Sequence, residues 1–147
     1  EGIVGYSLGR KDLNLFKNIV KNSFILSSVS GLIISIIYFF SYEQVINLMS
    51  DLEEIRKLSS SYVIWLIIFP LISSFCYQFD GIFIGASQTK ELRNAMIFSV
   101  FSYLIISIFL TKLLFNNGIW ISLCIFMILR ALSLFYYLNK IYLRFKS

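Results

Sequence analysis

Two ionisable side chains, Asp80 and Arg130, stand inside long apolar stretches of this 147-residue chain. Charged groups are costly within a lipid bilayer, and they usually face the interior of a helix bundle or a water-filled path. Asp80 is therefore a candidate proton- or cation-responsive carboxylate. Arg130 is a candidate partner for it, or a charge that faces a substrate. The alternative is that both side chains only anchor helix packing, or that Asp80 lies close enough to the cytoplasmic interface to stay hydrated.

The expected depths of these two side chains argue against a direct pair. When both helices are counted from their outer ends at a rise of about 1.5 Å per residue, Asp80 lies on the order of 10 Å deeper than Arg130. Direct pairing is therefore not expected.

Other chemistry is weakly indicated. The chain has no histidine, which removes the commonest general base and any Ser-His or Cys-His arrangement. Cys76 and Cys124 lie in apolar stretches without a CxxC pattern, and we interpret them as apolar fillers rather than a disulfide or metal site. The net charge of +5 comes from basic residues scattered between apolar stretches, which excludes a nucleic-acid-binding face. The sequence predicts no enzyme, no catalytic residues and no metal.

A proline and several glycines have conformational or packing interpretations. Pro70 lies within an apolar stretch, where it removes a backbone donor and kinks a helix, so it is a hinge candidate; proline is also common in passive spans. Gly81 and Gly85 form a GxxxG pattern, and Gly31 lies in a similar stripe of small residues. Because small residues let membrane helices approach closely, we interpret these glycines as helix-packing positions.

The elements that must position these residues are membrane-spanning helices. The chain is 58% hydrophobic and 14% charged, far more apolar than a soluble domain. Four runs, at about residues 15–40, 61–86, 95–115 and 119–138, reach the roughly 20 apolar residues that a spanning helix needs. The sequence predicts an all-α polytopic transmembrane bundle of four full spans plus an N-terminal helix stub at residues 1–9. Since the chain opens on Glu1 within this stub, we expect a fragment of a longer protein.

The connection after the first span and the flanking charges predict the orientation. Apolar residues recur at three- and four-residue steps over about residues 43–58, which predicts an amphipathic helix at the membrane surface. Nine basic residues flank the spans on one side and three on the other, and by the positive-inside rule the first side is cytoplasmic. The inner group is Arg10, Lys11, Lys17, Lys21, Lys90, Arg93, Lys140, Arg144 and Lys146; the outer group is Arg56, Lys57 and Lys112. This predicts a multi-pass protein of the plasma membrane, in a bacterium the inner membrane, with a cytoplasmic C-terminus.

Several motifs resemble a known family. The run from Tyr62 to Trp65, then Pro70, then the run from Cys76 to Ala86 resembles the tenth helix of the multidrug and toxic compound extrusion (MATE) transporters, in their DinF-like branch. The run from Glu91 to Met96 is similar to the entry to the eleventh helix, and the runs from Asn117 to Leu123 and from Phe126 to Ser133 are similar to the twelfth. Gly5 and Gly9 are similar to the end of the eighth.

The resemblance implies a twelve-helix antiporter of two six-helix lobes, driven by H⁺ or Na⁺ as coupling ion and without another cofactor. Residues 1–147 would supply the end of helix eight and helices nine to twelve of the C-terminal lobe. The implied partners are the lipid bilayer, the missing N-terminal lobe and a small-molecule drug or metabolite, of cationic or amphipathic character. Asp80 matches the Asp of the family's DG element. Because alternating access needs a second repeat, four spans alone are not expected to transport.

Three other functions stay open from the sequence. A lipid-linked sugar flippase of the same superfamily would need a broad cationic cavity, whereas Arg130 is the only basic residue that lies away from the span ends. A non-transporting membrane scaffold subunit would tolerate apolar replacement of Asp80 and Arg130. An intramembrane enzyme is disfavoured by the missing histidines.

Overall fold

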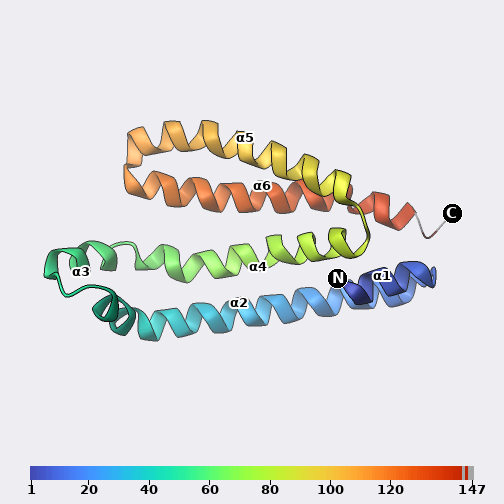
Figure 1. Ribbon diagram of the computed structural model, residues 1–147, viewed down its shortest axis with the longest axis horizontal. Helices are drawn as coiled ribbons and strands as arrows, with labels where there is room; N and C mark the ends of the chain where they lie inside the picture. Colours follow the sequence, from blue (N-terminus) through green and yellow to red (C-terminus); the bar gives the residue numbers. More distant parts are fainter. Residues whose placement is uncertain (144, 146–147) are drawn as a thin grey trace.

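The computed structural model describes residues 1–143 and 145, and it contains six helices over that part of the chain (Figure 1). They are α1 (Gly2–Gly9), α2 (Leu13–Met49), α3 (Glu53–Ser60), α4 (Val63–Gly85), α5 (Thr89–Leu114) and α6 (Asn116–Leu143). The helices α2, α4, α5 and α6 are long and apolar enough to cross a membrane. The predicted all-α bundle with four spans and an N-terminal stub is thus confirmed. Arg144 and Lys146, two of the predicted inner charges, lie outside the described residues.

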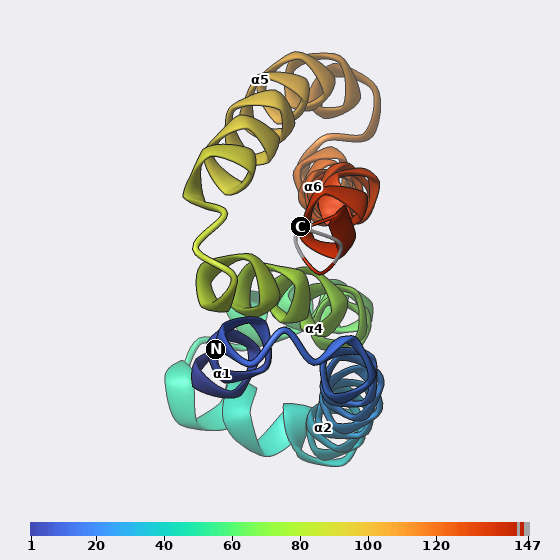
Figure 2. The ribbon, with the colours of Figure 1, turned by 90° about the vertical axis from the view of Figure 1, so that its right-hand side faces the viewer.

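The four long helices form a row rather than a closed ring, in which the neighbours α4 and α6 run in the same direction (Figure 1). Neighbouring helices in the row are α2 and α4, α4 and α6, and α6 and α5. Figure 2 shows this order end-on, with the short α1 lying beside α2 and α4. The row consists of two helix pairs, α2–α4 and α5–α6, which meet where α4 packs on α6. We call this contact the α4–α6 seam.

Much of the apolar surface of the row is exposed. Leu26 is 69% exposed and Phe101 is 64% exposed, although both lie within candidate spans. The packed core gathers at the end of the row where α1 lies, and Phe16, Phe83 and Leu134 are fully buried there. Exposed apolar side chains on long helices are expected where hydrocarbon, rather than water, surrounds the protein.

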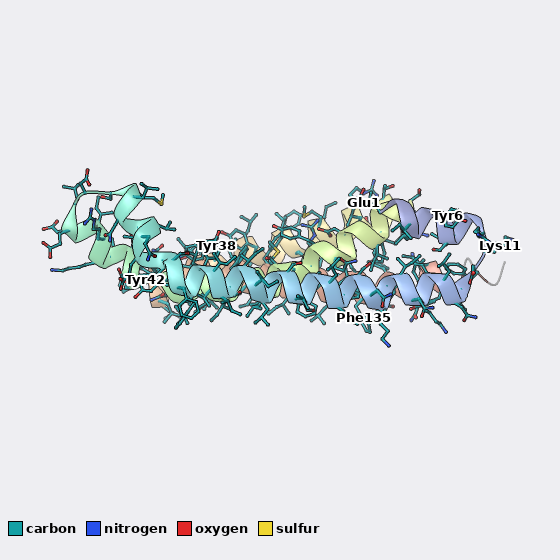
Figure 3. The ribbon with its side chains drawn as sticks, turned by 90° about the horizontal axis from the view of Figure 1, so that it is seen from below. Glu1, Tyr6, Lys11, Tyr38, Tyr42 and Phe135 are labelled. Atoms are coloured by element: carbon teal, nitrogen blue, oxygen red, sulfur yellow. The ribbon has the colours of Figure 1, made fainter. Side chains whose placement is uncertain are left out.

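The predicted amphipathic helix at about residues 43–58 is wrong in its bounds. Residues 43–49 belong to α2, and a short extended break at Ser50–Leu52 separates them from α3, which begins at Glu53. Arg56 stabilises this break, because its Nε donates to the carbonyl of Ser50 at 2.6 Å and its Nη2 to that of Asn47 at 3.4 Å. These carbonyls lie at the α2 end, where helical partners run out. Figure 3 shows the chain turning away from the long axis of α2 beyond Tyr42.

Candidate functional site: a buried ion pair at the α4–α6 seam

Asp80 on α4 and Arg130 on α6 form an ion pair across the seam. The distance between Oδ2 of Asp80 and Nη2 of Arg130 is 2.9 Å. The side chains are 13% and 11% exposed, respectively, so the pair is held inside the protein rather than on its surface. The expectation that these residues are too far apart in depth to pair is therefore wrong.

The error came from the assumed starting points of the two helices. Nε1 of Trp65 in the first turn of α4 donates to Oδ1 of Asn117 in the first turn of α6, at 2.9 Å. This hydrogen bond shows that Trp65 and Asn117 lie at the same height along the two helices. Asp80 follows Trp65 by about 15 residues and Arg130 follows Asn117 by about 13, so their depths differ by only about 3 Å. An arginine side chain spans that difference with ease.

The pair uses only part of its hydrogen-bonding capacity. A guanidinium and a carboxylate commonly form two parallel hydrogen bonds. Here Oδ1 of Asp80 and Nε of Arg130 are both buried, and within the described part of the chain neither has a hydrogen-bond partner. An unsatisfied buried polar atom costs about 1–3 kcal/mol, so the site has one acceptor and one donor available for a further interaction.

The surroundings of Asp80 are largely apolar. Cys76, one turn earlier on α4, is fully buried, and so is Phe83, almost one turn later. Within residues 1–143 and 145, no three His, Cys, Asp or Glu side chains lie close enough together to hold a metal ion. A lone carboxylate with one available oxygen suits neutralisation by a proton or a monovalent cation better than a divalent metal, which takes several oxygen ligands.

Pro70 and Gly31 meet where α2 packs on α4. A Cβ atom at Gly31 would lie 2.9 Å from Oγ of Ser74 and 3.0 Å from the carbonyl of Pro70, which indicates a close helix approach. Beside this contact runs a groove of about 490 Å³ that is lined by hydroxyl groups, including those of Ser27, Ser30 and Ser73. The α4 helix continues through Pro70. Its role as a hinge stays a prediction.

The two glycines of the GxxxG pattern lie in different surroundings. A Cβ atom at Gly85 would collide with the backbone of Glu1 and come within 2.9 Å of Cβ of Val4, so α1 packs directly on this glycine. At Gly81 the nearest atom, Cγ of Glu1, would be 3.8 Å away, which is ordinary contact. The packing therefore depends on Gly85 much more than on Gly81.

A second ion pair, between Glu91 and Lys140, was not predicted from the sequence. Nζ of Lys140 on α6 donates to Oε1 of Glu91 on α5 at 3.0 Å, and the Glu91 side chain is 10% exposed. It ties the beginning of α5 to the end of α6. The strict alternation of the spans places these two helix ends on the same side of the membrane, and this could have indicated the pair. From the sequence alone, Lys140 is identified only as a flanking charge.

Comparison with known proteins identifies the family. The sequence model of the MatE family matches residues 1–113. The chain is 32% identical over 130 residues to the DNA damage-inducible protein F of Escherichia coli (strain K12), an alignment that covers 88% of this chain and 28% of that relative. The chain thus spans little more than a quarter of the relative's length. No solved structure matches significantly. With the all-α row of four candidate spans, these matches show that the chain belongs to the MatE family of membrane transporters, and that it is similar to its DinF-like branch.

Proposed function

We propose that this chain is part of the C-terminal lobe of a secondary active efflux antiporter, which exports cationic or amphipathic compounds in exchange for H⁺ or Na⁺. The observation that supports this most strongly is the carboxylate of Asp80, which is buried among the helices and has one oxygen without a hydrogen-bond partner among the described residues. Ionisable groups in such places serve as ion or proton relays in many transporters.

The proposed assembly contains more helices than this chain has. The long helices of this chain pack as a single row of α2, α4, α6 and α5, whereas alternating access requires two repeats that rock against each other. A further lobe from the N-terminal part of the same transporter is the proposed partner. The proposed location is the bacterial inner membrane, with the end of α6 on the cytoplasmic side.

The test replaces Asp80 by Asn in the intact transporter that contains this chain. Asparagine keeps the size of the side chain but cannot take up a proton or balance a cation by charge. In proteoliposomes under an imposed pH or Na⁺ gradient, the Asp80→Asn variant is expected to lose gradient-driven ethidium transport, by about 100-fold or more if coupling depends on one carboxylate.

Asp12→Asn is the matched control. Asp12 caps the start of α2 by accepting from the backbone N–H of Leu15, outside the buried site. This variant is expected to retain gradient-driven transport. Full transport by Asp80→Asn would remove Asp80 from the coupling mechanism, and absence of gradient-driven ethidium transport by the unmodified protein would contradict the proposed activity with this substrate.

A further inference from the structure

We propose that Arg130 is a tethered cation that exchanges with the coupling ion at Asp80, so that the ion binds only as the guanidinium leaves. This inference rests on the proposed function, and it goes further by assigning a role to Arg130. It identifies Arg130 as a positioning residue that sets the ion concentration at which the transporter works.

The pair formed by Asp80 and Arg130 is neutral, with its two charged atoms 2.9 Å apart. Arginine stays protonated at any pH a protein meets, so its positive charge is permanent. A proton or Na⁺ approaching Asp80 therefore competes with a positive charge that is already in place.

The ion pair leaves one acceptor and one donor unused among the described residues. Oδ1 of Asp80 and Nε of Arg130 are buried and unpartnered within residues 1–143 and 145. A pair built purely for stability would be expected to use both, because two parallel bonds are the favoured geometry. The single bond leaves Oδ1 available as a first contact for an incoming cation, while Oδ2 still holds Arg130.

Other charged and titratable groups lie on the helices around the pair. Cys76 lies one turn earlier on α4, and Glu1 at the start of α1 packs near Gly81. Glu91 of α5 is engaged by Lys140 of α6. Arg130 is thus the cation placed to neutralise Asp80, and an ion that takes its place leaves a buried guanidinium that must move toward a new partner or water.

Movement of the Arg130 side chain changes the contact between the two helix pairs. The α4–α6 seam joins the two helix pairs of the row, as Figure 2 shows. Trp65 and Asn117 bond across it near one end, and Asp80 and Arg130 bond across it at a deeper level. Exchange of Arg130 for an ion removes the deeper bond and leaves the other in place, which couples ion binding to the packing of the two pairs.

The test measures the ion dependence of the intact transporter with Arg130→Gln. Without its tethered competitor, Asp80 is expected to take up the ion at a concentration lower by about tenfold or more. The midpoint is the ion concentration that gives half of the maximal effect. It is read from ethidium transport and, independently, from the rise in melting temperature that the ion produces in detergent. One series varies pH without Na⁺ and another varies Na⁺ at fixed pH, which separates the two ions.

Arg93→Gln is the matched control, since Arg93 is exposed near the start of α5, and it is expected to leave both midpoints unchanged. A folded Arg130→Gln protein with the unmodified protein's midpoints would overturn the inference. If ethidium transport is absent in the unmodified protein, the proposed function fails, while the melting-temperature midpoints still decide the role of Arg130.

A measurement on the unmodified protein keeps the inference testable if Arg130→Gln does not fold. The arginine reagent phenylglyoxal, followed by mass spectrometry, reports the ratio of modification at Arg130 to that at Arg93. The ratio is expected to rise severalfold as the concentration of H⁺ or Na⁺ passes through the value that gives half of the rise in melting temperature. A constant ratio across that range would overturn the exchange.

Discussion

At the scale of single residues, the glycines of α4 show how a motif can hold two unequal positions. Gly81 and Gly85 are one turn apart, and the sequence gives no reason to separate them. The structure places the backbone of Glu1 directly against Gly85, whereas a Cβ atom at Gly81 would meet no atom closer than 3.8 Å. Only one of the two positions therefore requires the absence of a side chain.

Alanine at these two positions should act in opposite directions. Gly85→Ala must push α1 away from α4, and overpacking of this kind costs about 1–3 kcal/mol. Gly81→Ala makes only an ordinary contact with Cγ of Glu1 and gains about 1 kcal/mol from helix propensity. The free energy of unfolding, measured by denaturant titration in detergent micelles, is expected to fall for the first variant and to stay equal or rise for the second. Equal losses for both would show that the contact with Glu1 does not limit packing.

The ion pair marks the limit of sequence reasoning at this scale. Asp80 and Arg130 are identifiable from the sequence because charge within apolar runs is rare. Their contact was not predictable, because it depends on the relative height of α4 and α6. The hydrogen bond between Trp65 and Asn117, 52 residues apart in the chain, marks positions of equal height on the two helices, and no local pattern reveals it.

At the scale of elements, the long helices were predictable and their ends were not. A run of about 20 apolar residues can satisfy its backbone groups in lipid only as a helix, so length and composition were sufficient. The break at Ser50–Leu52 was missed because the apolar residues Val45, Leu48, Leu52 and Ile55 keep a helical spacing across it. The bonds from Arg56 to the end of α2 are tertiary, and periodicity does not report them.

Arg56 should therefore hold the break between α2 and α3 in place. Replacing it with methionine keeps much of its length and removes the donors to the carbonyls of Ser50 and Asn47. Hydrogen bonds from charged donors contribute about 1.5–3 kcal/mol, so amide exchange over residues 47–56 is expected to accelerate by about tenfold or more.

Lys57→Met serves as the control for this element. Lys57 is 76% exposed and pairs with Glu53 within α3, an arrangement that contributes little on a surface. In the Lys57→Met variant, amide exchange over residues 47–56 is expected to stay near that of the unmodified protein. If Arg56→Met also exchanges at the unmodified rate, the break is held by some other feature, such as the extended conformation of Leu52.

At the scale of the whole molecule, the row of helices explains why so much apolar surface is open. The row exposes large side chains, such as Phe101 and Tyr136, and a protein of this shape needs lipid or further helices around it. The MatE match and the 28% coverage of the relative agree with a row that is part of a larger transporter. The number of spans follows from composition, whereas their order in space follows from pairwise packing that the sequence does not display.

The same row makes a prediction about sidedness. The α5 helix has 26 residues, which corresponds to about 39 Å at 1.5 Å per residue, enough to cross the bilayer. Lys90 at its beginning and Asn116 just beyond its end are both exposed, so cysteines at these positions are expected to react with an impermeant maleimide from opposite sides. Because basic residues concentrate at the Lys90 end, Lys90→Cys should label in inverted vesicles and Asn116→Cys in intact cells. The buried native thiols of Cys76 and Cys124 should give little background in the unsubstituted protein. Labelling of both cysteines from one side would mean that α5 does not cross the membrane, and the seam between α4 and α6 would then lose its place within the bilayer.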